Sequence, residues 1–149
     1  ALYLDSIRRW GEKVTWIRPL SFFEAVLEAH AKLHVARYEG RPAAAMIVCA
    51  WGDGAHYLAG ATDATLMEHC PSNLLMEDVA QHWHSQGKRY LDLGSSNGLE
   101  GVIQFKESFG ATPLTYAEIR RQGALGRLYF TLHRPYRRLK QSVVEVLKL

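Results

Sequence analysis

The sequence is poor in cysteine, with only Cys49 and Cys70 in 149 residues. One lies in an apolar run and the other precedes a proline, so they do not form a disulfide framework, and a reducing cytosol is expected. The chain also has no repeats, no low-complexity segment and no recognisable signal peptide. Its apolar runs are shorter than the ~20 residues that span a bilayer. We therefore expect a cytoplasmic protein, associated with a membrane at its surface if at all.

The proportions of apolar and charged residues are those of a globular protein. Apolar residues make up 48% of the chain and charged residues 22%, and the length allows a real core. We expect a single domain over residues 1–149, beginning with a helical segment over 1–32.

Three strands follow that segment. Leu33–Glu39 alternates, Ala43–Trp51 is almost continuously apolar, and Ala55–Ala61 completes the set. The turns at Glu39–Pro42 and Gly52–Gly54 are short, so the three strands are predicted to form an antiparallel meander.

A helix and a fourth strand come next. Ser72 is the expected N-cap of a helix over Asn73–Gln86, and the strand begins at Tyr90. A helix between two strands serves as a right-handed parallel crossover. The predicted fold is therefore α+β with a mixed sheet, and a ligand crevice is expected where the antiparallel and parallel parts meet.

The stretch from Tyr90 to Gly110 combines this strand with a Gly/Ser/Asn loop and a short helix. Val102, Phe105 and Phe109 fall at i, i+3 and i+7, which predicts one buried apolar face. Lys106 lies at the edge of that face and is expected to be half-buried.

The end of the chain is basic and aromatic. After a predicted strand over Thr112–Arg121, residues 126–149 are predicted to form a helix. Its cluster fits the phosphates of tRNA or an anionic membrane surface, although a solvated helix face explains it too; the cluster is Arg134, Arg137, Arg138 and Lys140, interleaved with Tyr129, Phe130 and Tyr136.

Taken together, four stretches resemble the GNAT (N-acetyltransferase) superfamily. They are the meander LHVARYEGRPAAAMIVCAWGDGAHYLAGAT, the helix PSNLLMEDVAQHWHSQG, the strand KRYLDLGSSN and the helix IQFKESFGA. The likeness is greatest to the C-terminal GNAT-like half of the Fem-like branch, the peptidoglycan-bridge aminoacyltransferases and related acyltransferases. Such enzymes have two halves, so this chain is expected to stand alone, to pair with a second half or a second copy, or to be a fragment.

The resemblance implies a transferase that moves an acyl or aminoacyl group to an amine, in cell-envelope biosynthesis. The donor would be a substrate, either acyl-CoA or aminoacyl-tRNA, with no tightly bound cofactor. Coenzyme A-using relatives carry a basic, Gly-rich loop before the central helix. Glu68–Asn73 has neither Arg nor repeated Gly here, although the helix start at Ser72 and Asn73 can still attract an anion. Both donors stay open.

The same resemblance assigns the site. Lys106 would be a catalytic cation near the donor, or a lysine that reaches to water from its helix edge. Backbone amides near Gly60 and Ala61 would stabilise an oxyanion. Asp92 would orient the amine or a loop serine, or would cap the next helix. The acceptor would meet Phe105, Ser95, Ser96, Asn97, Tyr57 and Asp63, although Asx and Ser turns explain the three loop residues Ser95, Ser96 and Asn97 equally well.

Two rival interpretations remain. LDLGSSNG also resembles the first motif of Rossmann-type methyltransferases that use S-adenosylmethionine, with Glu118 placed to hold a ribose. Alternatively, the chain is a non-catalytic module that binds tRNA or a membrane surface. No metal site is expected, because the histidines lack partners at ligand spacing.

Overall fold

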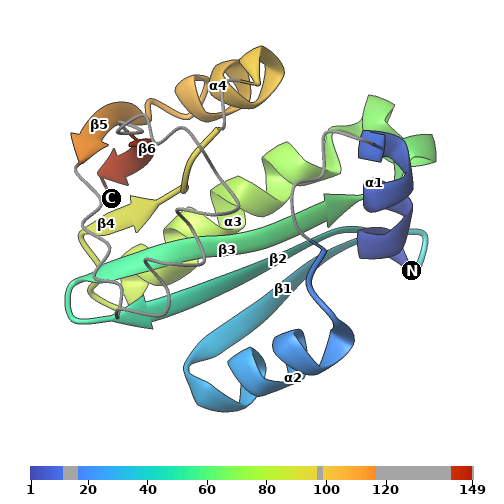
Figure 1. Ribbon diagram of the computed structural model, residues 1–149, viewed down its shortest axis with the longest axis horizontal. Coiled ribbons are helices and arrows are strands. Elements are labelled where there is room, and N and C mark those ends of the chain that lie inside the picture. Colours follow the sequence, from blue (N-terminus) through green and yellow to red (C-terminus); the bar gives the residue numbers. More distant parts are fainter. Residues whose placement is uncertain (12–16, 97–98, 117–141, 149) are drawn as a thin grey trace, which may run out of the picture.

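The computed structural model describes residues 1–11, 17–96, 99–116 and 142–148 (Figure 1). Its elements in chain order are α1 (Leu2–Trp10), α2 (Leu20–Ala29), β1 (Ala31–Tyr38), β2 (Arg41–Trp51), β3 (Gly54–Thr62), the 3-10 helix η2 (Ala64–His69), α3 (Pro71–Ser85), β4 (Tyr90–Asp92), α4 (Glu100–Glu107), β5 (Thr112–Tyr116) and β6 (Ser142–Lys148).

The strands form one mixed sheet in the order β1-β2-β3-β4-β6-β5. β3 and β4 are parallel, whereas the β1–β2, β2–β3, β4–β6 and β5–β6 pairs are antiparallel. The predicted α+β fold, an antiparallel meander joined to a parallel crossover strand, is confirmed.

The meander depends on its two turns. Glu39 and Gly40 have φ angles of 48° and 78°, and Gly52 has a φ of 52°. Positive φ at such positions gives a turn whose twist matches that of the flanking strands, so the chain reverses tightly at both places.

β3 contains a bulge at Leu58. Tyr57 pairs with Val48, but Ala59 pairs with Ile47, so one extra residue stands in β3 between these pairs. A bulge of this kind bends the strand and interrupts the alternation of its side chains.

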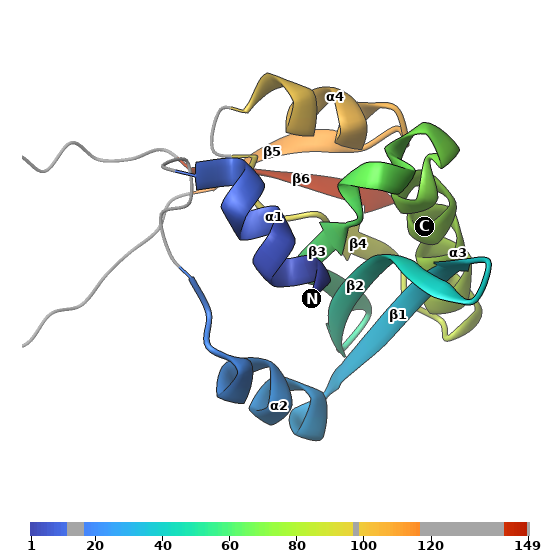
Figure 2. The ribbon, with the colours of Figure 1, turned by 90° about the vertical axis from the view of Figure 1, so that its right-hand side faces the viewer.

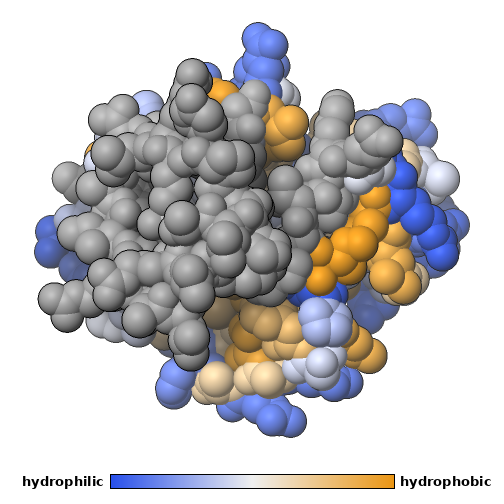
Figure 3. Space-filling view, viewed as in Figure 1, coloured by the Kyte–Doolittle hydropathy of each residue, from blue (hydrophilic) through white to orange (hydrophobic). Residues whose placement is uncertain are grey.

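Helices cover both faces of the sheet. Figure 2 shows α3 on one side of β1–β3, with α1 and α2 on the other. The face toward α3 holds the core, which consists of Ala44, Met46, Val48, Ala55, Leu75, Met76, Val79, Trp83, Leu91, Leu93 and Ala111. On the opposite face hydrophobic residues reach the surface around α2 and β1 (Figure 3), where Leu27, Leu33 and Val35 stay partly exposed.

The start of α3 differs from the prediction. The helix begins at Pro71, and Ser72 is not its N-cap; Cys70 occupies that position in the left-handed conformation, with a φ of 48°. Pro71 suits the first helical position because its ring fixes φ and its missing N–H is not needed there. The Ser72 hydroxyl instead forms a short hydrogen bond with Thr62 Oγ1, so the end of β3 is tied to the start of α3.

Both ends of the chain also need correction. The predicted terminal helix over 126–149 is wrong at Ser142–Lys148, which forms β6; this stretch holds three valines, whose branched side chains favour strands. Residues 126–141, with the basic-aromatic cluster, lie outside the described residues. At the other end, the helical segment expected over 1–32 stops at Ala29, and β1 begins at Ala31.

Candidate active site

β3 and β4 run side by side over a short distance. Gly54–His56 pair with Tyr90–Asp92, and no pair follows in the described residues of these two strands. β3 continues to Thr62, whereas Gly94, with a φ of 69°, turns the chain away from β4. The two strands therefore separate where the mixed sheet changes direction, as the sequence predicts.

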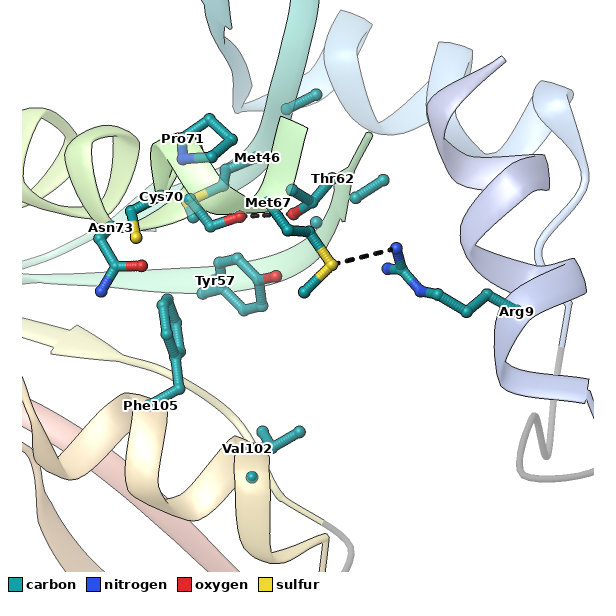
Figure 4. Close-up of a pocket in the computed structure, with 15 residues that line it drawn as sticks. Arg9, Met46, Tyr57, Thr62, Met67, Cys70, Pro71, Asn73, Val102 and Phe105 are labelled. Carbon is teal, nitrogen blue, oxygen red and sulfur yellow. Dashed lines mark hydrogen bonds between the residues drawn. The ribbon is translucent and has the colours of Figure 1, made fainter. Parts of the chain in front are cut away.

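A cavity of about 320 Å³ opens beside the separated strands. In Figure 4, Val102 and Phe105 of α4 lie on one side of it, Cys70 and Asn73 at the start of α3 lie on the other, and Tyr57 lies between them. Six residues that the sequence assigned to substrate or donor line this cavity: Tyr57, Gly60, Ala61, Ser72, Asn73 and Phe105.

Tyr57 lies against Gly60. A Cβ atom on Gly60 would overlap the Tyr57 hydroxyl and would stand 2.9 Å from its Cζ atom. Only glycine therefore lets the tyrosine ring lie along the strand. Burial raises the pKa of Tyr57 to about 12, so its hydroxyl stays protonated at neutral pH.

The start of α3 offers few donors to an anion. Pro71 has no N–H, and the N–H groups of Asn73 and Leu74 both donate to the Cys70 carbonyl, at 3.0 and 3.3 Å. Among these first four residues of α3, this leaves the N–H of Ser72. The positive end of the helix dipole is present, but its N–H groups are largely occupied.

Arg9 of α1 points toward the same cavity. Its Nη1 atom lies 3.7 Å from the sulfur of Met67 (Figure 4). A thioether is a weak acceptor, so this guanidinium keeps most of its capacity to bind an anion. The sequence analysis did not select Arg9, because nothing in a mixed amphipathic helix marks which arginine faces the sheet.

The chain beyond β4 is held by charged side chains. Lys106 Nζ donates to the Gly94 carbonyl at 2.8 Å, and Asp92 Oδ1 accepts from the Gly94 N–H at 2.8 Å. Lys106 is only 4% exposed. The expectation of a half-buried lysine is therefore wrong, because the ammonium points inward to a backbone acceptor. Conversely, Val102 is 36% exposed, so the predicted apolar face of α4 is open toward the cavity.

Asp92 also binds His56. Its Oδ2 atom lies 2.9 Å from Nδ1 of the imidazole. Burial by itself raises the pKa of Asp92, but the hydrogen bonds from His56 and from the Gly94 N–H, with the nearby charges of His56 and Lys106, more than offset it. The pKa of this carboxyl is therefore below its ordinary value, and Asp92 is ionised at neutral pH.

His56 is not among the site residues predicted from the sequence. A signal existed, since His56 and Asp92 are each the third residue of their strand, so parallel strands in register bring them opposite each other. The histidines were instead considered as metal ligands along the chain. Among the described residues, no group of three His, Cys, Asp or Glu side chains is placed to hold a metal ion.

The other predicted residues lie apart from the cavity. Asp63 accepts from the Thr65 N–H at 2.9 Å at the start of η2 and faces Arg41 at 3.4 Å. Hydrogen bonds from Thr65 and the Arg41 charge hold the pKa of Asp63 below its usual value. Ser95 is exposed and Ser96 is buried, whereas Asn97 lies outside the described residues.

Comparison with known proteins decides the family. A family model described as "Acetyltransferase (GNAT) domain" matches residues 3–107, well over half of the chain. The chain belongs to the GNAT acetyltransferase family. A search of curated proteins found no match.

Solved structures share this GNAT fold at low sequence identity. A ribosomal-protein-alanine N-acetyltransferase from Brucella melitensis is 13% identical, with a TM-score of 0.66, 99% of this chain and 90% of that chain covered. An acetyltransferase from Bacillus subtilis in complex with CoA is 13% identical, with a TM-score of 0.63 and coverages of 87% and 84%. A GNAT family acetyltransferase from Elizabethkingia anophelis with acetyl-CoA bound is 11% identical, with a TM-score of 0.57 and coverages of 88% and 84%.

Two points follow for this GNAT domain. The methyltransferase interpretation is wrong, because the LDLGSSNG stretch begins in the fourth strand of a mixed sheet and not at the end of the first strand of a parallel one. In addition, no helix among the described residues is long and apolar enough to cross a membrane.

Proposed function

We propose that this GNAT domain is an N-acyltransferase that moves an acetyl or larger acyl group from coenzyme A to an amine. The observation that carries the proposal is one continuous cavity, from the separation of β3 and β4 to the start of α3. An elongated thioester fits such a cavity, with its acyl group near Tyr57 and its phosphates toward Ser72. The relatives solved with CoA and acetyl-CoA support this donor.

The residues of the cavity have separate tasks in this proposal. Backbone amides of β3 near Gly60 and Ala61 stabilise the oxyanion that forms at the thioester carbonyl. Tyr57, protonated at neutral pH, gives its proton to the departing sulfur. Arg9 supplies the positive charge toward the donor's phosphates that Glu68–Asn73 lacks.

Lys106 and Asp92, selected from the sequence as catalytic, are given supporting tasks. Because Lys106 donates to Gly94 and is buried, we assign it to fixing the loop after β4. Ser95 and Asn97 stay proposals for the acceptor side, and the acceptor itself is an amine of unspecified structure, as in the relatives named for alanine N-acetylation.

A second donor is favoured by one observation. The N–H groups at the start of α3 are mostly used internally, which suits an aminoacyl-tRNA whose phosphates lie elsewhere. With that donor, the Fem-like branch and a role in cell-envelope biosynthesis would follow.

A thermal melt with acetyl-CoA tests the first donor. Ligand at ~100 times its dissociation constant adds ~2.7 kcal/mol of stability, a shift of several degrees for a domain of this size. Gly101→Leu should abolish the shift. Gly101 lines the cavity and has open space around its Cβ position, so the leucine side chain would occupy the space of the donor without clashing with the described residues. Gln104→Leu, on the exposed side of the same helix, should keep it.

Thiol release from acetyl-CoA in the presence of primary amines is the companion measurement. Binding with release supports the acyltransferase. Absence of both overturns the coenzyme A donor and leaves aminoacyl-tRNA, whereas binding without release with any amine favours a non-catalytic module.

A further inference from the structure

His56 and Tyr57 are adjacent in sequence but face opposite sides of the sheet. Tyr57 pairs with Val48 and so shares the core face, whereas His56 pairs with Cys49 on the other face. His56 is also the last residue of β3 that pairs with β4. Past this residue the strands separate. Tyr57 lines the cavity on the core face, and His56, which is not part of the cavity lining, stands at the same strand separation on the other face.

The imidazole of His56 has a defined orientation and proton. Asp92 Oδ2 lies 2.9 Å from Nδ1, and an ionised carboxylate can only accept, so Nδ1 carries a proton, and in the neutral imidazole Nε2 is then the acceptor. Asp92 is itself fixed by the Gly94 N–H at 2.8 Å. The His56 side chain is 30% exposed, so a substrate can reach it.

We propose that His56 is the general base of the transfer and that Asp92 is its positioning residue; this inference rests on the proposed function. His56 Nε2 takes a proton from the acceptor ammonium. The neutral nitrogen then forms a bond to the thioester carbon, the carbon–sulfur bond breaks, and the thiolate takes the Tyr57 proton. The second proton of the attacking nitrogen passes to the Tyr57 phenolate as the amide forms, and the His56 imidazolium releases its proton to solvent. One residue thus serves the acceptor from one face of β3, and its neighbour serves the donor from the other.

The charges around His56 are compatible with this role. Asp92 faces it from β4, Lys106 reaches Gly94 from α4, and the Trp51 ring lies 6.5 Å from the imidazole. The carboxylate stabilises the imidazolium that forms when the amine is deprotonated, which is the task of the acidic member in catalytic triads. The Lys106 charge disfavours the imidazolium from beyond Gly94, and it adds the smallest of the contributions that lower the pKa of Asp92, after the hydrogen bonds from His56 and from the Gly94 N–H.

The test compares two nucleophiles with acetyl-CoA as donor, followed by thiol release at neutral pH. Glycinamide, a small alkylamine, is partly an ammonium and needs a base, whereas hydroxylamine is already neutral. His56→Gln should lower kcat/KM for glycinamide about 100-fold or more, as loss of a general base does, and change the hydroxylamine rate less than about threefold. Asp92→Asn should give a smaller loss with the same selectivity. His84→Gln, an exposed histidine of α3, is the matched control and should change neither.

Two further results make the outcome decisive. Added imidazole should restore glycinamide turnover to His56→Ala, which a damaged fold would not allow. Equal losses with both nucleophiles, or no loss with either, would overturn the role of His56 while the acyltransferase stands. If the wild-type protein neither binds acetyl-CoA nor releases thiol with either nucleophile, the proposed function fails first.

Discussion

The two ends of the proposed site are built differently. At the junction end, where β3 and β4 part, Lys106, Asp92 and His56 do not line the cavity itself and are joined through Gly94 by hydrogen bonds of 2.8–2.9 Å. At the helix end, around Cys70–Asn73, the peptide N–H groups are mostly used within α3.

This difference suggests that the junction end orients the reacting groups, whereas the helix end contributes to the affinity for the donor. Groups that take part in bond making need fixed positions, because small displacements reduce the rate steeply. A bound phosphate tolerates a looser site if a cation is near, and we propose that Arg9 supplies that cation. We therefore expect changes at the junction end to affect turnover and stability together, and changes at the helix end to affect donor KM.

Lys106→Met should have the largest effect. It leaves the Gly94 carbonyl without its charged donor, which destabilises by roughly 1.5–3 kcal/mol and lowers Tm by about 4–10 °C. Turnover should fall about 100-fold as Asp92 and His56 lose their placement. Lys88→Met is the control, since Lys88 Nζ also donates to a glycine carbonyl, that of Gly52 at 2.7 Å, but at the surface. A large loss of turnover with unchanged Tm would mean that Lys106 acts on the substrate directly.

Gly60→Ala should come next. The new methyl group overlaps the Tyr57 hydroxyl, so the ring must move into the cavity at a cost of roughly 1–3 kcal/mol. Acetyl-CoA KM should rise about tenfold, equivalent to about 1.4 kcal/mol of binding. Gly54→Ala, in the same strand with open space around its Cβ position, should leave KM unchanged. Equal KM values for the two variants would contradict the placement of the donor beside Tyr57.

Arg9→Gln should have a smaller effect, confined to the helix end. Loss of one phosphate contact at an exposed site should raise acetyl-CoA KM several-fold, by about 1 kcal/mol, and make it less dependent on salt. Arg8→Gln serves as the control, because Arg8 faces Asp5 at 2.9 Å in an exposed pair. If KM responds to salt equally in both variants, Arg9 does not hold the donor.

The smallest expected effect is on thermal stability at acidic pH. Folding lowers the pKa of Asp92, so its ionised form stabilises the fold above about pH 4, the ordinary range of an aspartate. That stabilisation is lost as pH falls through the lower folded value. Asp92→Asn should therefore show a flatter decline of Tm below about pH 4 than the wild type. Asp5→Asn, at an exposed surface pair, should follow the wild-type curve; parallel curves for all three proteins would argue against a structural charge at Asp92.

Local chemistry explains what could be predicted from the sequence. The glycine-containing turns and the apolar run of β2 define the meander, and the helix between β3 and β4 defines the parallel step. Gly87 and Gly110, which follow α3 and α4, have φ angles of 75° and 78°, the conformation in which glycine commonly ends a helix. Such features depend on the residue itself and its neighbours along the chain.

What could not be predicted depends on distant partners. In the sequence Lys106 lies at the edge of an apolar helix face. Its burial depends on the Gly94 carbonyl, twelve residues earlier, which accepts a hydrogen bond from its ammonium in the fold. His56 becomes notable only when the parallel register brings Asp92 opposite it. Likewise serine is a favoured N-cap residue, so Ser72 was a reasonable helix start, but with the left-handed Cys70 as N-cap the helix begins at Pro71, two residues before the predicted start at Asn73.

The bulge at Leu58 changes which residues of β3 face the core, halfway along the strand. Up to Tyr57 the odd-numbered residues share the core face, and after Leu58 the even-numbered ones do, since Gly60 pairs with the core residue Met46. Residues three apart, which point to opposite sides of a regular strand, here lie on the same side. The tyrosine can therefore rest its hydroxyl on a glycine of its own strand. Removing the single residue Leu58 would leave Gly60 opposite Met46, but two positions from Tyr57 instead of three. The fit of the tyrosine ring over this glycine would then change, although neither residue had been altered.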